Sequence, residues 1–105
     1  MINLNDLAKT SFEISQKRGK PYSDVSAEKI LKYTAGEVIE ASFAASVYKH
    51  ASGKSGQLKA QEKRLLAGEF ADIIVCVLIA AHSENIDIEQ SLIDCVEKNK
   101  KRIRS

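Results

Sequence analysis

The sequence predicts an all-α protein built from four helices. Apolar residues recur three and four positions apart in four segments, as on one face of a helix. No segment combines alternating polarity with β-branched residues and hairpin turns, which would indicate strands. With 105 residues, 44% of them hydrophobic and 29% charged, the chain has the size and composition of one soluble globular domain. We therefore expect a four-helix bundle-like single domain over residues 1–105, with short connections between its helices.

The first predicted helix starts at Asn3 or Asn5 and runs to Arg18, because the segment 19–23 contains Pro21 and breaks the pattern. The second is capped by Ser26 and runs to about residue 50. The apolar positions of this second helix include Ile30, Leu31, Tyr33, Val38, Ala41, Ala44, Ala45 and Tyr48. The segment 52–56, Ser-Gly-Lys-Ser-Gly, is expected to be a flexible connection.

The third predicted helix spans about Leu58 to Glu84 and is apolar on almost every face after Phe70. A helix that is apolar all round lies at the centre of a bundle or in an oligomer interface. Its surplus apolar surface predicts self-association, as a homodimer or homotetramer. The fourth helix starts at Asp87, an N-cap with Gln90 at the third helical position, and continues toward the C-terminus.

Several features predict a cytoplasmic protein. The longest apolar run, Ile73 to Ala81, has nine residues against the ~20 needed to cross a bilayer. It is expected to be a buried helix, with no membrane association. Cys76 and Cys95 lie in helical patterns without a CxxC motif and are expected to be reduced. Polar residues near the N-terminus interrupt any signal peptide.

Two acidic pairs lie inside apolar helical segments: Glu37 with Glu40, and Glu69 with Asp72. Residues three apart share one face of a helix, so each pair presents two carboxylates side by side. Four carboxylates gathered in a partly buried place repel one another, and a bound cation is the usual remedy. A site made only of carboxylate oxygens favours a hard divalent ion, Mg²⁺ or Mn²⁺. The alternative is that each pair belongs to a solvated helix face, where this spacing is common.

Other chemistries lack support in the sequence. Neither His50 nor His82 follows a glutamate by three residues, as in di-iron helix bundles, and both are expected to be structural. The Gly53 to Gly56 segment lacks the upstream glycine and strand of a phosphate-binding loop. No base partner is evident for a Ser or Cys nucleophile. A carboxylate-held metal beside a basic helix end remains, and this combination is typical of phosphate chemistry.

Positive charge is concentrated at the C-terminus, at Lys98, Lys100, Lys101, Arg102 and Arg104. Asn99 and Arg102 are three apart, so they share a face and are expected to reach a polyphosphate together. The alternatives are a solvated basic helix end, which the helix dipole favours, or a nucleic-acid-binding surface. A net charge of +2 argues against nucleic acid as a partner.

Three stretches of the chain resemble the MazG-type all-α nucleoside triphosphate pyrophosphohydrolases, in particular the small single-domain forms related to dCTP pyrophosphatase. The first is Gly36-Glu37-Val38-Ile39-Glu40-Ala41, and the second is Gly68-Glu69-Phe70-Ala71-Asp72-Ile73-Ile74. The third is Asn85-Ile86-Asp87-Ile88 followed by Glu97-Lys98-Asn99-Lys100-Lys101-Arg102. Together they cover roughly residues 26 to 104, in the family's order and spacing.

The resemblance implies a Mg²⁺-dependent homo-oligomer that hydrolyses a nucleoside triphosphate, a dNTP above all, to its monophosphate and pyrophosphate. Its role would be to cleanse the nucleotide pool. The four acidic residues fall on the family's metal-binding positions and form the implied catalytic set: Glu37, Glu40, Glu69 and Asp72. The implied substrate-binding set lies in the C-terminal motif: Lys98, Asn99, Lys101 and Arg102. Of these, Asn99 and Arg102 fall on positions that contact the nucleotide phosphates.

The chain departs from the family at two points. Cys95 stands where many relatives carry a lysine, so phosphate contacts are expected from Lys98 or from another subunit. Relatives selective for dCTP use histidine and tryptophan around the base, whereas this chain has no tryptophan and no histidine before residue 50. Phe12 and Tyr22 are the candidates for a stacking surface, with core packing as the alternative for Phe12.

Two other functions stay open. A relative tuned to dUTP or phosphoribosyl-ATP would use the same residues on another substrate. A non-catalytic helical interaction module would keep the fold without the activity, although four intact acidic positions argue against such decay.

Overall fold

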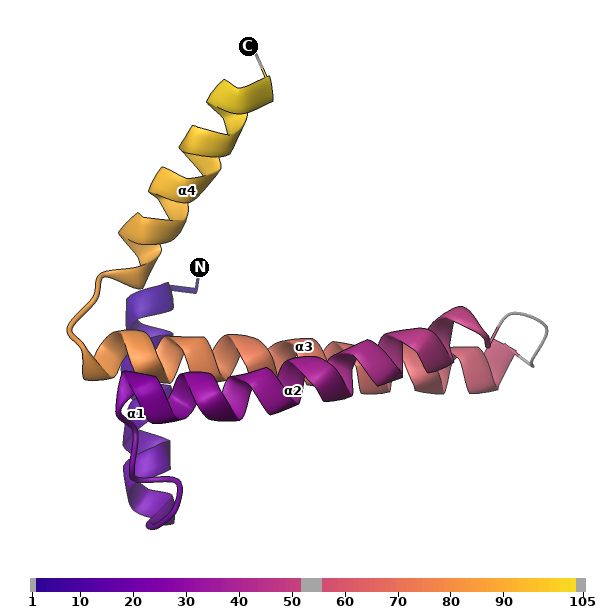
Figure 1. The fold of residues 1–105 in the computed structure, drawn as a ribbon, viewed down its shortest axis with the longest axis horizontal. Helices are drawn as coiled ribbons and strands as arrows, with labels where there is room; N and C mark the ends of the chain where they lie inside the picture. Colours follow the sequence, from indigo (N-terminus) through magenta and orange to yellow (C-terminus); the bar gives the residue numbers. More distant parts are fainter. Residues whose placement is uncertain (1, 52–55, 104–105) are drawn as a thin grey trace. The chain divides into compact units, whose positions relative to one another are not determined.

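The computed structural model describes residues 2–51 and 56–103, and only the backbone of Gln57. The described residues form four helices and contain no strand, so the all-α prediction is confirmed (Figure 1). The helices are α1 (Leu4–Arg18), α2 (Ala27–Lys49), α3 (Gly56–Ser83) and α4 (Ile88–Ile103). Each begins and ends within about two residues of the predicted position. Residues 52–55 of the predicted flexible connection lie outside the described residues, and Gly56 opens α3.

The chain divides into two compact units. One comprises Met1–Ala27 and Leu78–Ser105, and the other comprises Glu28–Val77. The second unit consists of α2 and most of α3, and it holds all four acidic residues of the predicted metal site. Packing of all four helices as one bundle stays a prediction.

Side chains at the starts of α1 and α4 satisfy the free amides of the first helical turn. The Asn3 carboxamide oxygen accepts hydrogen bonds from the amides of Asn5 and Asp6, at 2.9 and 3.2 Å. The Asp87 carboxylate accepts one from the Gln90 amide at 3.0 Å, which confirms the predicted N-cap. It also accepts one from the Asn5 side chain at 2.8 Å, and these two bonds lower the pKa of Asp87.

An asparagine ends α3. Asn85 takes a left-handed conformation, with φ of 56°, and donates its amide to the His82 carbonyl at 3.1 Å. The following amide, of Ile86, reaches back to the Ala81 carbonyl at 2.9 Å. This pair of bonds is the Schellman motif, which asparagine tolerates because its side chain permits positive φ. The chain therefore turns sharply before α4 begins.

Contacts from α1 to the start of α4 and to the end of α3 hold the first unit together. The Leu4 amide donates to the Glu89 carboxylate at 3.4 Å, and the Asn5 side-chain oxygen accepts from the Glu89 amide at 3.3 Å. Farther along α1, the rings of Phe12 and His82 lie 4.8 Å apart between centroids. A packing role for both residues agrees with the sequence prediction.

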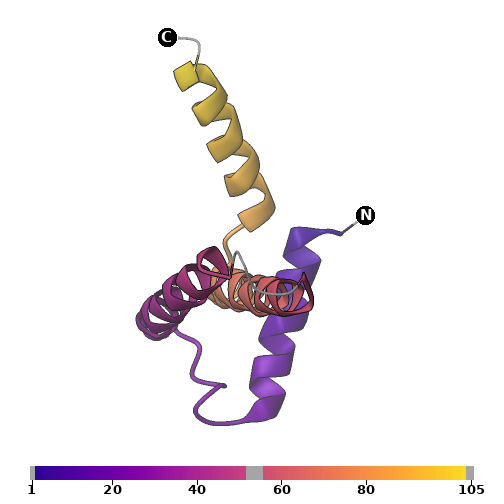
Figure 2. The same cartoon turned by 90° about the vertical axis from the view of Figure 1, so that its right-hand side faces the viewer.

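In the second unit, α2 and α3 run antiparallel and side by side (Figures 1 and 2). Along each helix, residues spaced alternately four and three apart are less exposed than their neighbours. We call these two rows the seam. On α2 the seam is Ile30, Thr34, Glu37, Ala41, Ala44 and Tyr48; on α3 it is Glu62, Leu66, Glu69, Ile73 and Cys76. A repeat of this kind is the mark of two helices packed along a coiled-coil-like stripe.

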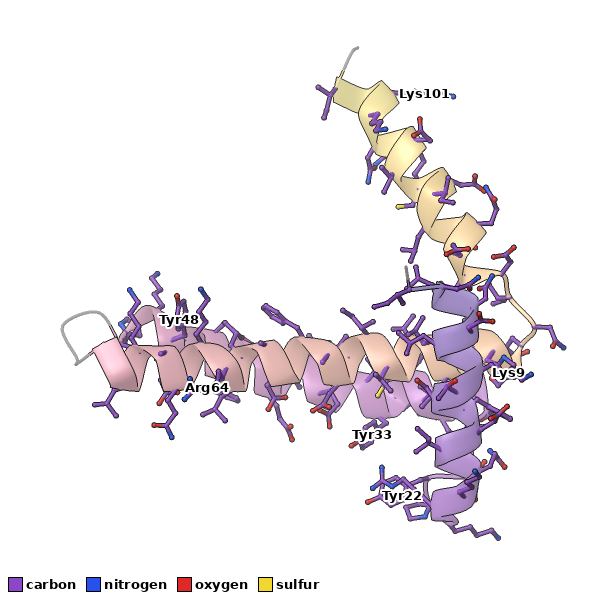
Figure 3. All side chains as sticks on the ribbon, turned by 180° about the vertical axis from the view of Figure 1, so that it is seen from behind. Lys9, Tyr22, Tyr33, Tyr48, Arg64 and Lys101 are labelled. Carbon is purple, nitrogen blue, oxygen red and sulfur yellow. The ribbon has the colours of Figure 1, made fainter. Side chains whose placement is uncertain are left out.

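Much of the apolar surface of this helix pair is exposed, contrary to one prediction. Ile74 is 55% exposed, and Val75 and Val77 are each 38% exposed. The prediction that residues 73–81 form a buried helix is therefore wrong for the isolated chain over most of that run, where Leu78, Ala80 and Ala81 are the buried members. The reason is that two helices bury only one stripe of each other, and α3 is apolar on several faces. Large side chains on α2, such as Tyr33, also project away from the pair (Figure 3).

By length and composition alone, the segment Leu58–Ser83 of α3 would be able to cross a membrane. The prediction from the nine-residue run underestimated this length, because the apolar stretch extends on both sides of it and Glu69 and Asp72 are the only acidic or basic residues from Leu65 to Ser83, histidine aside. The core helix of a soluble protein can have the same length and composition.

Candidate metal centre

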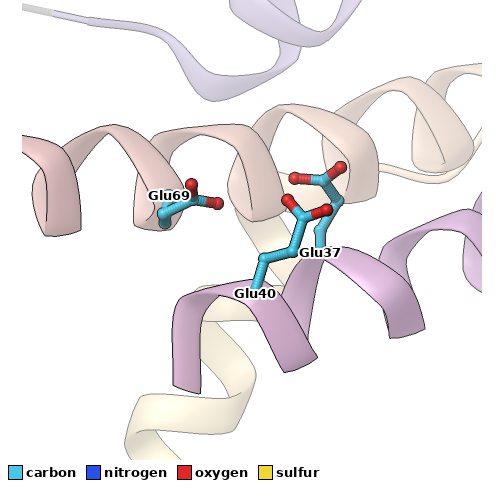
Figure 4. Close-up of side chains that lie close together, drawn as sticks. All are labelled: Glu37, Glu40 and Glu69. Carbon is cyan, nitrogen blue, oxygen red and sulfur yellow. The ribbon is translucent and has the colours of Figure 1, made fainter. Parts of the chain in front are cut away.

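Three of the four predicted acidic side chains come together between α2 and α3. Glu37 and Glu40 lie on successive turns of α2, and Glu69 projects toward them from α3 (Figure 4). One carboxylate oxygen from each of the three lies within 4.8 Å of the others. Because the helices are antiparallel, residues about 30 positions apart in sequence meet here. These three carboxylates therefore share one face of the helix pair.

The degree of exposure differs among the three carboxylates. Glu37 and Glu69 are seam residues of intermediate exposure, and Glu40 lies outside the seam and is exposed. The second carboxylate oxygen of Glu69, Oε2, is shielded from solvent and has no hydrogen-bond partner among the described residues. A shielded carboxylate oxygen without a donor is costly, and a cation is one partner that would satisfy it. The donor set, all carboxylate oxygen on two helices with one oxygen unpaired, fits a hard divalent cation.

The electrostatics of Glu69 report the same crowding. Burial raises the pKa of Glu69 above its ordinary value, and the nearby carboxylates of Glu40, Glu37 and Asp72 raise it further. All four causes act in one direction, and among the described residues no cationic side chain offsets them. The metal-free cluster therefore holds a proton more readily than a solvated glutamate does.

Asp72, the fourth predicted ligand, lies near this cluster but outside the group of three. It is exposed, and its charge contributes to the raised pKa of Glu69. It lies one turn beyond Glu69 on α3, as the spacing requires. The structure therefore brings together Glu37, Glu40 and Glu69, with Asp72 at the edge of the cluster.

Sequence reasoning missed one polar contact next to the cluster. Thr34, three residues before Glu37 on the α2 seam, is buried, and its hydroxyl donates to the Ile30 carbonyl at 2.7 Å. Cys76, four residues after Asp72 on α3, is a half-buried seam residue, and burial raises the pKa of its thiol. The sequence signal that could have indicated this residue is a small polar side chain three positions before Glu37, on the same face of the helix.

The predicted phosphate-binding residues lie on α4, in the other compact unit. Lys98, Asn99, Lys101 and Arg102 are all exposed, and α4 stays helical through this segment, so Asn99 and Arg102 share a face. The Asn99 amide lies 3.9 Å from the Cys95 sulfur, one turn earlier on α4. Lys100 forms an exposed ion pair with Glu97 at 3.0 Å. Their joint action with the carboxylates stays a prediction.

The two aromatic candidates for base stacking are both engaged in the first unit. The guanidinium carbon of Arg18 lies 3.5 Å from the centroid of the Tyr22 ring, a cation–π contact. Phe12 packs against His82. Neither contact indicates a base preference.

The chain was compared with protein-family models, with curated proteins and with solved structures, and none of them matches it. The resemblance to MazG-type enzymes stays a prediction from the motifs.

Replacing Glu69 by glutamine should stabilise the metal-free protein near neutral pH. A carboxyl whose pKa is raised in the folded state favours folding most below its unfolded pKa of about 4.3, and this contribution is lost as pH rises through the folded pKa. Wild type therefore carries a repulsive charge at neutral pH that Glu69→Gln lacks. We expect a Tm a few degrees above wild type near neutral pH and no difference near pH ~4. Thermal melts in EDTA at both pH values measure it.

The matched control is Glu62→Gln, which removes a seam carboxylate seven residues earlier on α3 and outside the cluster. It should leave the Tm difference between neutral and acidic pH as in wild type. Equal melting temperatures for Glu69→Gln and wild type at neutral pH would show that the cluster carries no repulsion.

Proposed function

We propose that this protein is a Mg²⁺-dependent nucleoside triphosphate pyrophosphohydrolase. The observation that carries the proposal is the group of three carboxylates from two helices, within 4.8 Å of one another, with one shielded oxygen of Glu69 left unpaired. Folding tolerates such a group when a ligand repays its cost, and a divalent cation does so. The motif order shared with MazG-type enzymes supports the phosphate chemistry.

In this proposal Glu37, Glu40, Glu69 and Asp72 hold Mg²⁺, or Mn²⁺ in its place. A divalent cation bound there would neutralise phosphate oxygens and make a water molecule more acidic. A water oxygen attacks the α-phosphorus, the bond from that phosphorus to the bridging oxygen breaks, and pyrophosphate leaves. The raised pKa of Glu69 makes it the carboxyl best able to take up a proton when the cation is absent.

The α4 residues bind the substrate phosphates. Arg102 offers a planar fork of donors that matches phosphate geometry, and Asn99 offers an amide on the same face. Lys98 and Lys101 add positive charge without fixed geometry. A dNTP is the proposed substrate, with dUTP or phosphoribosyl-ATP as the variants that the same residues would accept.

The exposed apolar faces of α2 and α3 favour self-association over insertion into a membrane. Glu69 and Asp72 lie within the membrane-length segment of α3, and an aspartate at a bilayer centre costs roughly 2.5–3.5 kcal/mol. An interface between copies leaves the carboxylate face open to solvent and covers the apolar faces. A cytoplasmic homodimer or homotetramer is therefore part of the proposal. A non-catalytic oligomeric module is the second candidate, which the same apolar faces favour.

Activity should require a divalent cation and intact carboxylates. Pyrophosphate release from the (d)NTPs should stop in EDTA and return with Mg²⁺ or Mn²⁺. Glu40→Gln and Asp72→Asn should abolish turnover while far-UV circular dichroism stays that of wild type, because each removes a charged oxygen ligand and keeps the side-chain shape. Glu28→Gln, an exposed substitution at the start of α2, is the control. Full turnover in EDTA would refute the metal role. If wild type with Mg²⁺ or Mn²⁺ turned over none of the nucleotides tested, the non-catalytic module would be favoured.

Arg102→Ala should lower kcat/KM by ~10- to 1,000-fold, because it removes a charge-assisted bond to phosphate. Lys100→Ala is the matched control, since Lys100 points to another side of α4 and pairs with Glu97. A second control suggested by the sequence, Arg104, lies outside the described residues. Steady-state kinetics on both variants provides the measurement. Small and equal effects would identify the basic cluster as a solvated helix end.

The protein should be a dimer or tetramer in solution. Phe43 is 69% exposed on α2, and Leu65 and Phe70 are 57% and 52% exposed on α3. An obligate interface that covers such residues should bury upward of ~2,000 Å². Multi-angle light scattering should show the oligomer for wild type and a smaller species for Phe43→Lys, whereas Ser42→Lys at the neighbouring exposed position should behave as wild type. A folded, active monomer at micromolar concentration would contradict this.

A further inference from the structure

Helix α4 has an apolar stripe that is largely exposed. Leu92, Ile93, Val96 and Ile103 recur three, four and seven residues apart, so they share one side of the helix. We call these four residues the α4 stripe. Their exposed fractions run from 45% at Leu92 to 85% at Ile103, and none of the residues of α4, all of which are described, is buried. An exposed stripe of this kind on an amphipathic helix indicates a surface that packs against another helix.

The first half of the α4 stripe forms a shallow groove with the start of α1, and acidic residues line this groove. Its apolar lining consists of Leu4 and the first three stripe residues, and its acidic lining consists of Glu89 and Glu97. The Leu4 amide donates to the Glu89 carboxylate at 3.4 Å, which helps to hold α1 beside this end of α4. The groove is therefore suited to an apolar side chain that lies among positive charges.

The other end of α4 presents such a side chain. Ile103 is the most exposed residue of the stripe, and it directly follows Lys100, Lys101 and Arg102. Along the chain the charge changes sign once: every charged residue from 84 to 97 is acidic, and every one from 98 onward is basic. The helix dipole accounts for this order of charges, but it does not account for an exposed isoleucine next to the cations. One end of α4 is thus complementary to the other.

An antiparallel pair of α4 helices would bring complementary ends together. If Leu92 of one copy lies opposite Ile103 of the other, the two-fold axis passes midway, between residues 97 and 98, where the charge changes sign. The acidic turns of each copy then face the basic turns of the other, and the two helix dipoles oppose each other. A parallel pair would set acidic turns against acidic turns and basic turns against basic turns. Charge therefore favours the antiparallel direction.

We infer that α4 forms an antiparallel pair with α4 of a second copy, with Ile103 of each copy seated in the groove beside Leu4 of the other. The inference goes beyond the proposed function, because it adds a second interface to that of α2 and α3 and depends on neither the activity nor the cation. Lys98 and Arg102 lie outside the stripe and Asn99 lies at its edge, so the pairing leaves the proposed phosphate-binding side of α4 uncovered. Two different two-fold interfaces on one chain give a tetramer.

Multi-angle light scattering on the full-length chain tests this interface. Val96→Lys places a charge within the stripe and should halve the molar mass of wild type, from tetramer to dimer. Val96 is 52% exposed, so the lysine can be accommodated by the chain's own fold. Ser91→Lys is the matched control, because it adds the same charge at an exposed position on the opposite side of α4 and should leave the mass unchanged. Phe43→Lys should also give a dimer, and its combination with Val96→Lys should give a monomer.

Disulfide trapping tests the direction of the pair. The native cysteines are first replaced by Cys76→Ala and Cys95→Ala. In this background, co-expressed Leu92→Cys and Ile103→Cys chains should form a cross-linked heterodimer on mild oxidation, because the antiparallel register brings these two positions together. Neither chain alone should cross-link with itself. A parallel pair would give the reverse result.

The outcomes separate the inference from the proposed function, since pyrophosphate release enters none of these measurements. A molar mass of Val96→Lys equal to that of wild type, or the same loss of mass in Ser91→Lys, would overturn the α4 interface. A smaller mass for Phe43→Lys alone would then leave the α2 and α3 interface in place. Self-cross-linking of Ile103→Cys without the mixed product would overturn the antiparallel direction. A monomeric wild type would overturn both interfaces.

Discussion

The close approach of like charges between α2 and α3 is the constraint that the packing of the second unit has to satisfy. Glu37 and Glu69 occupy seam positions, where helices that pack against each other normally place apolar side chains. Glu40 joins them from the flank, and all three lie within 4.8 Å of one another. In the described part of the chain no neighbouring cationic side chain lowers the pKa of Glu69, which burial and three nearby carboxylates raise. The helix pair is thus held together against a repulsion at its own centre.

The rest of the seam is suited to this constraint. Alanine at positions 41 and 44 lets the helices approach closely, and aliphatic residues on α3 face them. Carboxylates set in such a row have fixed backbones, so their oxygens converge without much freedom to spread apart. Side chains on rigid helices form more exact ligand sets than side chains on loops do.

The sequence predicted the elements of the fold well and their burial less well. Helix ends could be predicted because the signals are local: Asp87 at the start of α4 needed only Gln90 to be recognised as a cap. The burial of residues 73–81 could not, because an apolar side chain such as Ile74 has the same pattern whether it faces its own chain or a partner. The hydrophobic pattern gives the periodicity of a helix, but it does not show whether the same chain or a partner covers the apolar face.

In the candidate site, too, the local features could be predicted from the sequence and the long-range arrangement could not. The spacing of Glu37 and Glu40 fixed one pair on α2, and the spacing of Glu69 and Asp72 fixed the other on α3. Their meeting depends on the register of an antiparallel pair, which is a long-range property. Thr34 escaped notice for that reason: alone it is a common helical residue, and its burial beside the cluster depends on how α3 packs against α2.

The proposed function places two demands on α3, apolar surface outward and acidic surface at the seam, and together they would explain its composition. A helix that must cover a partner on one side and gather carboxylates on another has little room for ordinary solvated residues, so Glu69 and Asp72 stand within a long apolar run. The same run would be a poor membrane span, since the carboxylates would have to be dehydrated with no cation beside them. In the proposed assembly with other copies, those carboxylates would stay free to bind an ion while Phe70 and its neighbours are covered. The proposed interface and the proposed ion site therefore impose compatible requirements on one helix, and each would account for residues that the other leaves unexplained.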